Sequence, residues 1–150
     1  MPTSRNLPPK IKIYEALGAI ADERVEIDGI LAYQGTVHSA STKGKSYTIS
    51  YAPETNSIKS NDSGSVNQWY IGYPAIAFLL KIWKLNYNSE ILPMLEHIDR
   101  SRIKQQVNKH HEETRRVLLG KLFQQWYDVD ILVNECDSIY QQLEDMKLNQ

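Results

Sequence analysis

The chain has 150 residues, a formal net charge of −1, 41% apolar residues and 23% charged residues, which is ordinary globular usage. The near-zero charge argues against a global attraction to nucleic acid or to an anionic membrane. A single cysteine, Cys136, excludes an intramolecular disulfide. The segment Met1–Lys10 has no signal-peptide core, and the longest apolar run, Ala75–Leu80, is too short to span a bilayer. We expect a cytoplasmic protein without membrane association.

The length fits one domain. We expect a flexible tail over residues 1–9 and a single α+β domain over residues 10–150. Within that domain, residues 10–85 form a helix, sheet and helix, and residues 89–150 form a helical part. The first helix is predicted over Lys10–Asp22, because a proline pair precedes apolar residues at helical spacing.

The pattern then changes to the alternation of short strands. Val25 and Ile27 alternate with charged residues, and Asp28-Gly29 is typical of a two-residue hairpin turn. The return strand is expected over Ile30–Ser39, with Gly35 as a bulge position. A second hairpin is expected from Tyr47–Tyr51 and Ser57–Ser60. The prediction is a small antiparallel sheet of about four short strands.

A polar loop is expected over Asn61–Asn67, before Gly72-Tyr73-Pro74 opens a second helix. The segment from Pro74 to Lys84 is apolar on almost every side, which predicts a buried central helix. A short helix capped by Ser89 follows.

Two long helices are predicted at the C-terminal end, over about Asp99–Tyr127 and from the N-cap Asp128 onward. They form a helical hairpin. The last helix carries a sustained apolar stripe, made of Val129, Leu132, Val133, Cys136, Ile139, Tyr140, Leu143 and Met146. Its spacing is close to a heptad repeat. Two interpretations are open: the stripe closes the core within the monomer, or it pairs with a second copy as a homodimer.

The charges of these two helices are sorted. Residues Arg100–Trp126 hold seven basic and two acidic residues, whereas residues Tyr127–Gln150 hold six acidic residues and one basic residue. Charge runs are usually paired or solvated, so the two helices can simply neutralise each other. The alternative is a partner surface, in which Arg115 and Arg116 of a basic helix over residues 100–121 bind nucleic acid.

Residues Tyr47–Lys84 resemble the ββα layout of SWIM-type zinc fingers. In that family a C-x-C leaves the second strand and a C-x-H opens the helix, and the corresponding positions here are Ser60, Asp62, Gly72 and Pro74. None of these four is cysteine or histidine, the donors that zinc prefers. The resemblance implies a metal-free version held by core packing, and the family's roles imply binding of DNA or protein.

Aromatic residues are the most suggestive candidates for a binding site. Trp69, Tyr70 and Tyr73 cluster just before the central helix. Together with the tyrosines of the strands they could form a stacking platform for bases or a groove for a peptide. The alternative is that they pack the sheet against the helices, as aromatic residues commonly do in small domains.

No catalytic, phosphate-binding or metal-binding motif is present, and we expect neither a cofactor nor a metal. Cys136 is expected to be a small buried hydrophobic residue, since Glu135 and Asp137 beside it disfavour a thiolate. The sequence thus favours a non-catalytic protein-interaction or regulatory module. The alternative is a nucleic-acid-binding regulator that uses the basic helix over residues 100–121 or a surface of aromatic residues and lysines. The third hypothesis is an enzyme whose site is not visible in the sequence.

Overall fold

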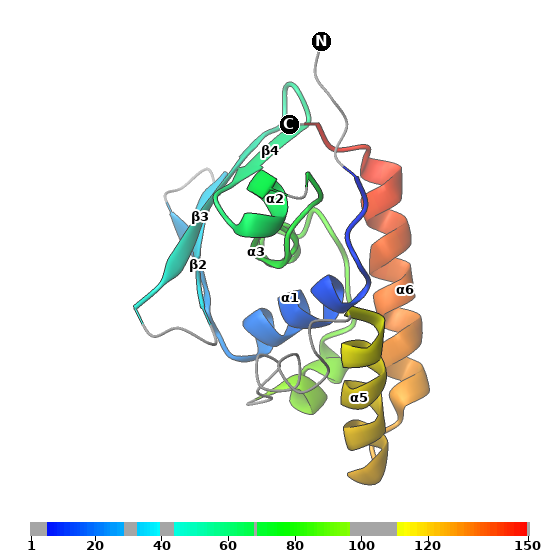
Figure 1. The fold of residues 1–150 in the computed structure, drawn as a ribbon. Helices are drawn as coiled ribbons and strands as arrows, with labels where there is room; N and C mark the ends of the chain where they lie inside the picture. Colours follow the sequence, from blue (N-terminus) through cyan, green and yellow to red (C-terminus); the bar gives the residue numbers. More distant parts are fainter. Residues whose placement is uncertain (1–5, 29–32, 40–43, 68, 97–110, 150) are drawn as a thin grey trace.

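A computed structural model describes residues 6–28, 33–39, 44–67, 69–96 and 111–149. It confirms the α+β class, with a four-stranded antiparallel sheet packed against helices (Figure 1). The elements in chain order are α1 (Ile11–Ala21), β1 (Val25–Asp28), β2 (Gln34–His38), β3 (Ser46–Ala52), β4 (Ser57–Ser60), α2 (Ser63–Asn67), α3 (Tyr73–Lys81), the 3₁₀ helix η1 (Ser89–Leu95), α5 (His111–Gln124) and α6 (Val129–Met146). No helix within the described ranges has both the length and the apolar composition needed to cross a bilayer.

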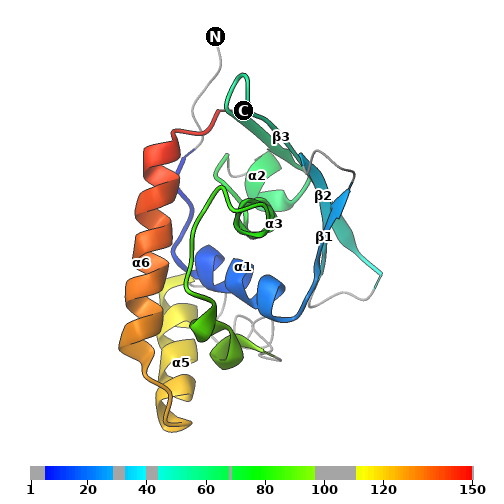
Figure 2. The same ribbon diagram turned by 180° about the vertical axis from the view of Figure 1, so that it is seen from behind.

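The sheet is a meander in the order β1-β2-β3-β4. Its inner face is apolar because alternate residues of each strand point toward the helices. The buried members on this face are Val25, Val37, Ile49, Tyr51 and Ile58. Helix α3 lies against this face and α1 packs on α3, while α5 and α6 lie side by side beyond α1, away from the sheet (Figures 1 and 2).

The first hairpin has a different register from the predicted one. A two-residue turn at Asp28-Gly29 would pair Ile27 with Ile30, but Ile27 pairs with Gly35 and Asp28 pairs with Gln34. Gly35 is a regularly paired residue and not a bulge. A Cβ at Gly35 would lie 2.8 Å from the ring of Phe78, so this glycine makes room for the central helix.

The buried central helix is confirmed as α3. Gly72 is its N-cap, Pro74 lies in its first turn, and every residue from Pro74 to Leu80 is buried. The segment before it differs from the prediction, because the polar stretch expected to be a loop folds into the five-residue helix α2. The carboxylate of Asp62 accepts the backbone N–H of Ser65 at 3.1 Å and so caps α2.

The helical hairpin is also confirmed, with a boundary change. Helix α5 ends at Gln124 and not at Tyr127, and the predicted helical residues 99–110 lie outside the described part. Asp128 caps α6 as predicted, accepting the N–H groups of Asp130 and Ile131 at 3.2 and 3.4 Å. The innermost stripe residues are at most 2% exposed, namely Leu132, Cys136, Ile139 and Leu143. The stripe therefore closes the core within the monomer.

Both ends of the described chain are fastened to the body. Near the C-terminus, Asn149 donates its N–H to the carbonyl of Asn56 at 2.9 Å and accepts the N–H of Ile58 at 3.0 Å. This pairing covers the outer edge of β4, which would otherwise present free backbone groups. In the segment expected to be a tail, Asn6 donates its N–H to the carbonyl of Trp69 and Pro8 is buried.

Candidate functional site

The predicted aromatic cluster before α3 is partly buried. Tyr70 lies against the short helix α2, where a Cβ on Gly64 would come within 2.4 Å of its ring. Burial raises the pKa of the Tyr70 hydroxyl above its ordinary value. Trp69 is half-buried, and its carbonyl accepts the N–H of Asn6. These two residues hold the N-terminal segment and α2 in place.

The tyrosines do not join into one platform. Tyr73 meets Tyr47 edge to face with a ring-centre distance of 6.1 Å, and Tyr33 meets Tyr51 in the same way at 6.4 Å. Tyr47 and Tyr51 are four residues apart on one strand, which separates the two pairs by about 13 Å. Desolvation raises the pKa of Tyr73. In the described residues these rings pack the ends of the sheet, so they offer no continuous stacking surface.

The two adjacent arginines point in different directions, as successive residues of a helix must. Arg115 is turned inward, where its guanidinium donates to Glu112 at 3.2 Å and to the hydroxyl of Tyr14 at 3.4 Å. The hydrogen bond between Arg115 and Glu112 holds the pKa of Glu112 below its ordinary value. Arg116 is exposed. Arg115 thus anchors α5 on α1, and only Arg116 presents its charge to a partner.

Cys136 lies next to Tyr14 and is 2% exposed. Burial is the largest influence on the thiol and raises its pKa. The hydrogen bond with Tyr14 lowers this pKa, and the charges of Asp137 and Glu135 raise it further. A thiol in this state is a poor nucleophile.

A buried carboxylate, which the sequence did not single out as a site, links the sheet to α3. Asp62 is 6% exposed and accepts the hydroxyl of Ser60 and the hydroxyl of Ser65, the latter at 2.8 Å. The Ser65 hydroxyl in turn accepts the N–H of Gly72 at 3.2 Å. A Cβ on Gly72 would lie 1.9 Å from the Oδ2 of Asp62, so only glycine fits against the carboxylate. We call Ser60, Asp62, Ser65 and Gly72 the Asp62 cluster.

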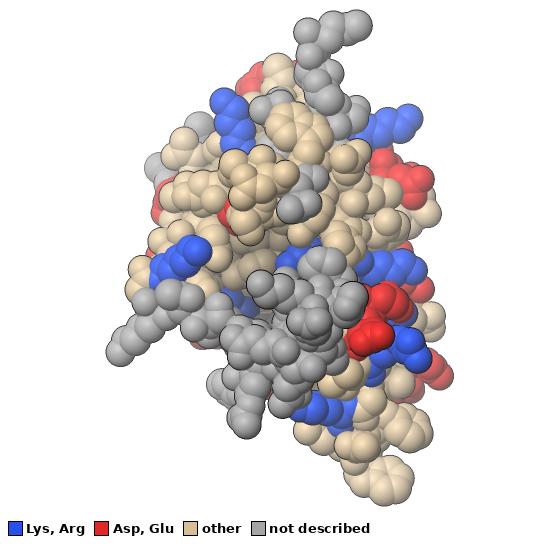
Figure 3. Space-filling model, in the orientation of Figure 1, with Lys and Arg blue, Asp and Glu red and all other residues tan. Residues whose placement is uncertain are grey.

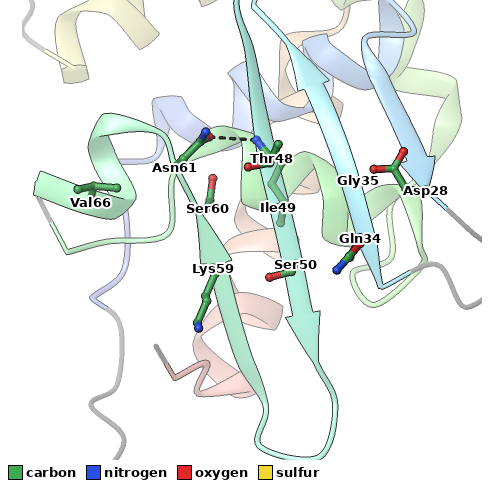
Figure 4. A pocket seen from close by; sticks show the side chains of 10 residues that line it. All are labelled: Asp28, Gln34, Gly35, Thr48, Ile49, Ser50, Lys59, Ser60, Asn61 and Val66. Carbon is green, nitrogen blue, oxygen red and sulfur yellow. Dashed lines mark hydrogen bonds between the residues drawn. The ribbon is translucent and has the colours of Figure 1, made fainter.

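The outer face of the sheet carries an open polar groove of about 500 Å³ (Figure 4). Asp28, Gln34, Ser50 and Lys59 form one cross-strand row in it, because each pairs with the next across the four strands. Asn61 accepts the N–H of Thr48 at 3.0 Å. A polar outer face is usual for an antiparallel sheet with one buried face. The groove offers hydrogen-bonding groups and one charge of each sign, and the residues lining it include no histidine or cysteine.

The end of the helical hairpin exposes large apolar side chains. The exposed fractions are 69% for Phe123, 95% for Trp126, 37% for Tyr127 and 47% for Ile131. We call these four residues the hairpin tip. The surface at the lower end of the molecule, where α5 meets α6, is largely uncharged (Figure 3).

Trp126 has a backbone that is unusual for its residue type. Its φ is 68°, in the left-handed region that favours glycine. It donates its N–H to the carbonyl of Phe123 at 3.0 Å, and the next residue, Tyr127, donates to the carbonyl of Leu122 at 3.2 Å. This pair of bonds is the Schellman motif, in which glycine usually takes the position of Trp126. Tryptophan, the largest side chain, thus occupies a backbone position that favours glycine, and its ring is almost fully exposed to solvent.

These features define a small α+β domain with a hydrophobic hairpin tip. Within the described ranges, no group of three or more histidine, cysteine, aspartate or glutamate side chains is placed to hold a metal ion. The chain belongs to the family described as "Uncharacterised conserved protein UCP014422", whose model matches residues 5–149. Comparisons with curated proteins and with solved structures give no match.

Proposed function

We propose that this protein is a non-catalytic protein-interaction module that binds its partner through the hairpin tip. The observation that carries the proposal is Trp126, which is 95% exposed and has a left-handed backbone. A non-glycine residue that is held in a disfavoured backbone conformation while its side chain stays exposed is a candidate for function. Tryptophan is also among the residues that contribute most to binding energy at protein interfaces.

The size of the tip supports the same conclusion. Its four side chains expose on the order of 500 Å² of apolar surface, a patch size that on a monomer is often functional. Its nearest charged neighbours in sequence are Lys121, Asp128 and Asp130, which are exposed and can form a polar rim.

The alternative, a nucleic-acid-binding regulator, draws less support from the described residues. It relied on Arg115 and Arg116, but Arg115 is already bonded to Glu112 and Tyr14. The tyrosines of the strands and Tyr73 are packed in two separate pairs, and Trp69 and Tyr70 are partly buried. We keep the cytoplasm as the proposed location, on the basis of the single cysteine.

We further propose that the β-hairpin of β3 and β4 and the central helix α3 form a metal-free version of the SWIM-type unit. Three of the four positions that correspond to zinc ligands, Ser60, Asp62 and Gly72, lie together in the Asp62 cluster. Hydrogen bonds to a carboxylate would then replace the metal. The quadruple variant S60C/D62C/G72C/P74H should bind Co²⁺ with a tetrahedral absorption spectrum, and a spectrum unchanged from that of aqueous Co²⁺ would refute the correspondence.

The interaction proposal can be tested by site-specific photo-crosslinking in cells. A benzophenone amino acid replaces Phe123 in one variant and Thr48, on the outer face of the sheet, in a matched control. We expect a discrete protein adduct from position 123 that is lost when Trp126→Ser is added. If position 123 gives no adduct, or only the adducts that position 48 gives, the hairpin tip is not a protein-binding surface.

A further inference from the structure

We infer that the partner is a second copy of this chain, with the two α5 helices packed antiparallel across Gly120. This inference rests on the proposed function and names its occupant. The dimer inferred here is not a coiled coil along the apolar stripe of α6, because that stripe is buried within the monomer. The residues that carry it are on the solvent side of α5.

Gly120 is in an unusual place for a glycine. It is exposed in the interior of α5, and a Cβ there would meet no atom of the described residues within 4 Å. Leu118 and Leu122, two positions to either side, are 1% exposed, so Gly120 faces directly away from the core. Glycine in a helix interior costs about 1 kcal/mol relative to alanine. Nothing in the described part of the monomer uses the space, whereas a bare backbone allows a second helix to approach closely.

The surface on either side of Gly120 is self-complementary, which a two-fold interface requires. When antiparallel helices cross at Gly120, position 123 of one copy lies at the level of positions 116 and 117 of the other. Phe123 is 69% exposed, and a hollow of about 430 Å³ adjoins Val117, lined among the described residues by Glu113, Arg116 and Val117. The ring of each copy can therefore enter the hollow of the other.

The charges on this face are compatible with the same arrangement. The crossing places Arg116 opposite Phe123 and Gln124 of the second copy, both uncharged, so no like charges meet on the central stripe. Helix α5 and Trp126 would bury on the order of 600 Å² per copy, the low end of the range for specific interfaces. We therefore expect a dimer that dissociates at micromolar concentrations.

The test is the mass of the purified full chain by sedimentation equilibrium over a wide concentration range. We expect a reversible shift from 17.3 kDa to twice that value. Gly120→Ala should raise the melting temperature, because alanine favours the helix, and yet weaken the dimer about tenfold or more, because its methyl group separates the helices. Phe123→Ala should weaken the dimer similarly. Lys59→Ala, on the outer face of the sheet, is the matched control and should leave the dimer unchanged.

A mass of 17.3 kDa at every concentration would overturn the inference. So would a dimer that Gly120→Ala and Phe123→Ala leave intact. In either case an adduct between position 123 and a different protein in the crosslinking experiment would show that the interaction module stands and that only its occupant is wrong. Absence of any adduct would remove both proposals.

Discussion

Replacing Gly72 by alanine should destabilise the fold through Asp62. The backbone of Gly72, with φ −72° and ψ 165°, is open to any residue, so alanine introduces no conformational strain. Its Cβ, however, would lie 1.9 Å from Oδ2 and 2.6 Å from Cγ of Asp62, which forces the carboxylate to move. That carboxylate accepts three hydrogen bonds, from Ser60 and twice from Ser65. Hydrogen bonds to a charged group contribute about 1.5–3 kcal/mol each, so a partial loss should cost about 3 kcal/mol.

The assay is urea unfolding followed by circular dichroism, arranged as a double-mutant cycle. In the Asp62→Ala background the carboxylate is absent, the new methyl group has room, and Gly72→Ala should cost less than about 0.5 kcal/mol. Gly120→Ala serves as the matched control, measured at concentrations where the chain is monomeric, and should stabilise the fold by about 0.5–1 kcal/mol. An equal cost of Gly72→Ala in both backgrounds would refute the reasoning, because the penalty would then not pass through Asp62.

Three further predictions concern the helical hairpin. Gln142→Ala should cost about 1–3 kcal/mol of unfolding free energy, because the Gln142 amide bonds both the N–H and the carbonyl of Asn86 at 2.8 and 2.9 Å; Gln141→Ala, which removes one surface bond, should be nearly neutral in the same urea titration. The folded-state pKa of Cys136 is raised, so its contribution to stability is complete below about pH 9 and is lost as the pH rises further. In urea titrations at about pH 8 and about pH 10, the unfolding free energy of Cys136→Ala should therefore fall less between the two pH values than that of the unsubstituted chain. An identical fall would contradict the burial of the thiol. Trp126→Gly should raise the melting temperature or leave it unchanged, because glycine suits the left-handed position, and a clear decrease would show that the ring stabilises the monomer.

The sequence predicted those elements whose signals are local. Helix α3 has an unbroken apolar surface and a proline in its first turn, and α6 has an N-cap aspartate and a regular stripe. The register of the first hairpin failed because it depends on a distant contact. The turn signal at Asp28-Gly29 is outweighed by the fit of Gly35 beneath Phe78, forty-three positions further along the chain.

The candidate site was harder to predict than the fold. Trp69, Tyr70 and Tyr73 stand out by composition, but composition does not show which face of a ring is covered. Trp126 follows the helix predicted over Asp99–Tyr127 at helical spacing, so the sequence pattern places it within the helix. Only the hydrogen bonds of the helix end reveal that its backbone is left-handed and its ring exposed.

The three tryptophans of the chain share a left-handed backbone, and Trp126 differs from the other two in the exposure of its ring. Trp69, Trp83 and Trp126 all have positive φ, between 57° and 68°. Trp69 is half-buried, and its carbonyl accepts the N–H of Asn6. Trp83 stacks on Tyr87 with ring centres 5.3 Å apart and planes 5° apart. In these two cases contacts within the chain offset the cost of the backbone. For Trp126, 95% exposed, no described residue provides such an offset, and a partner at the hairpin tip would supply it.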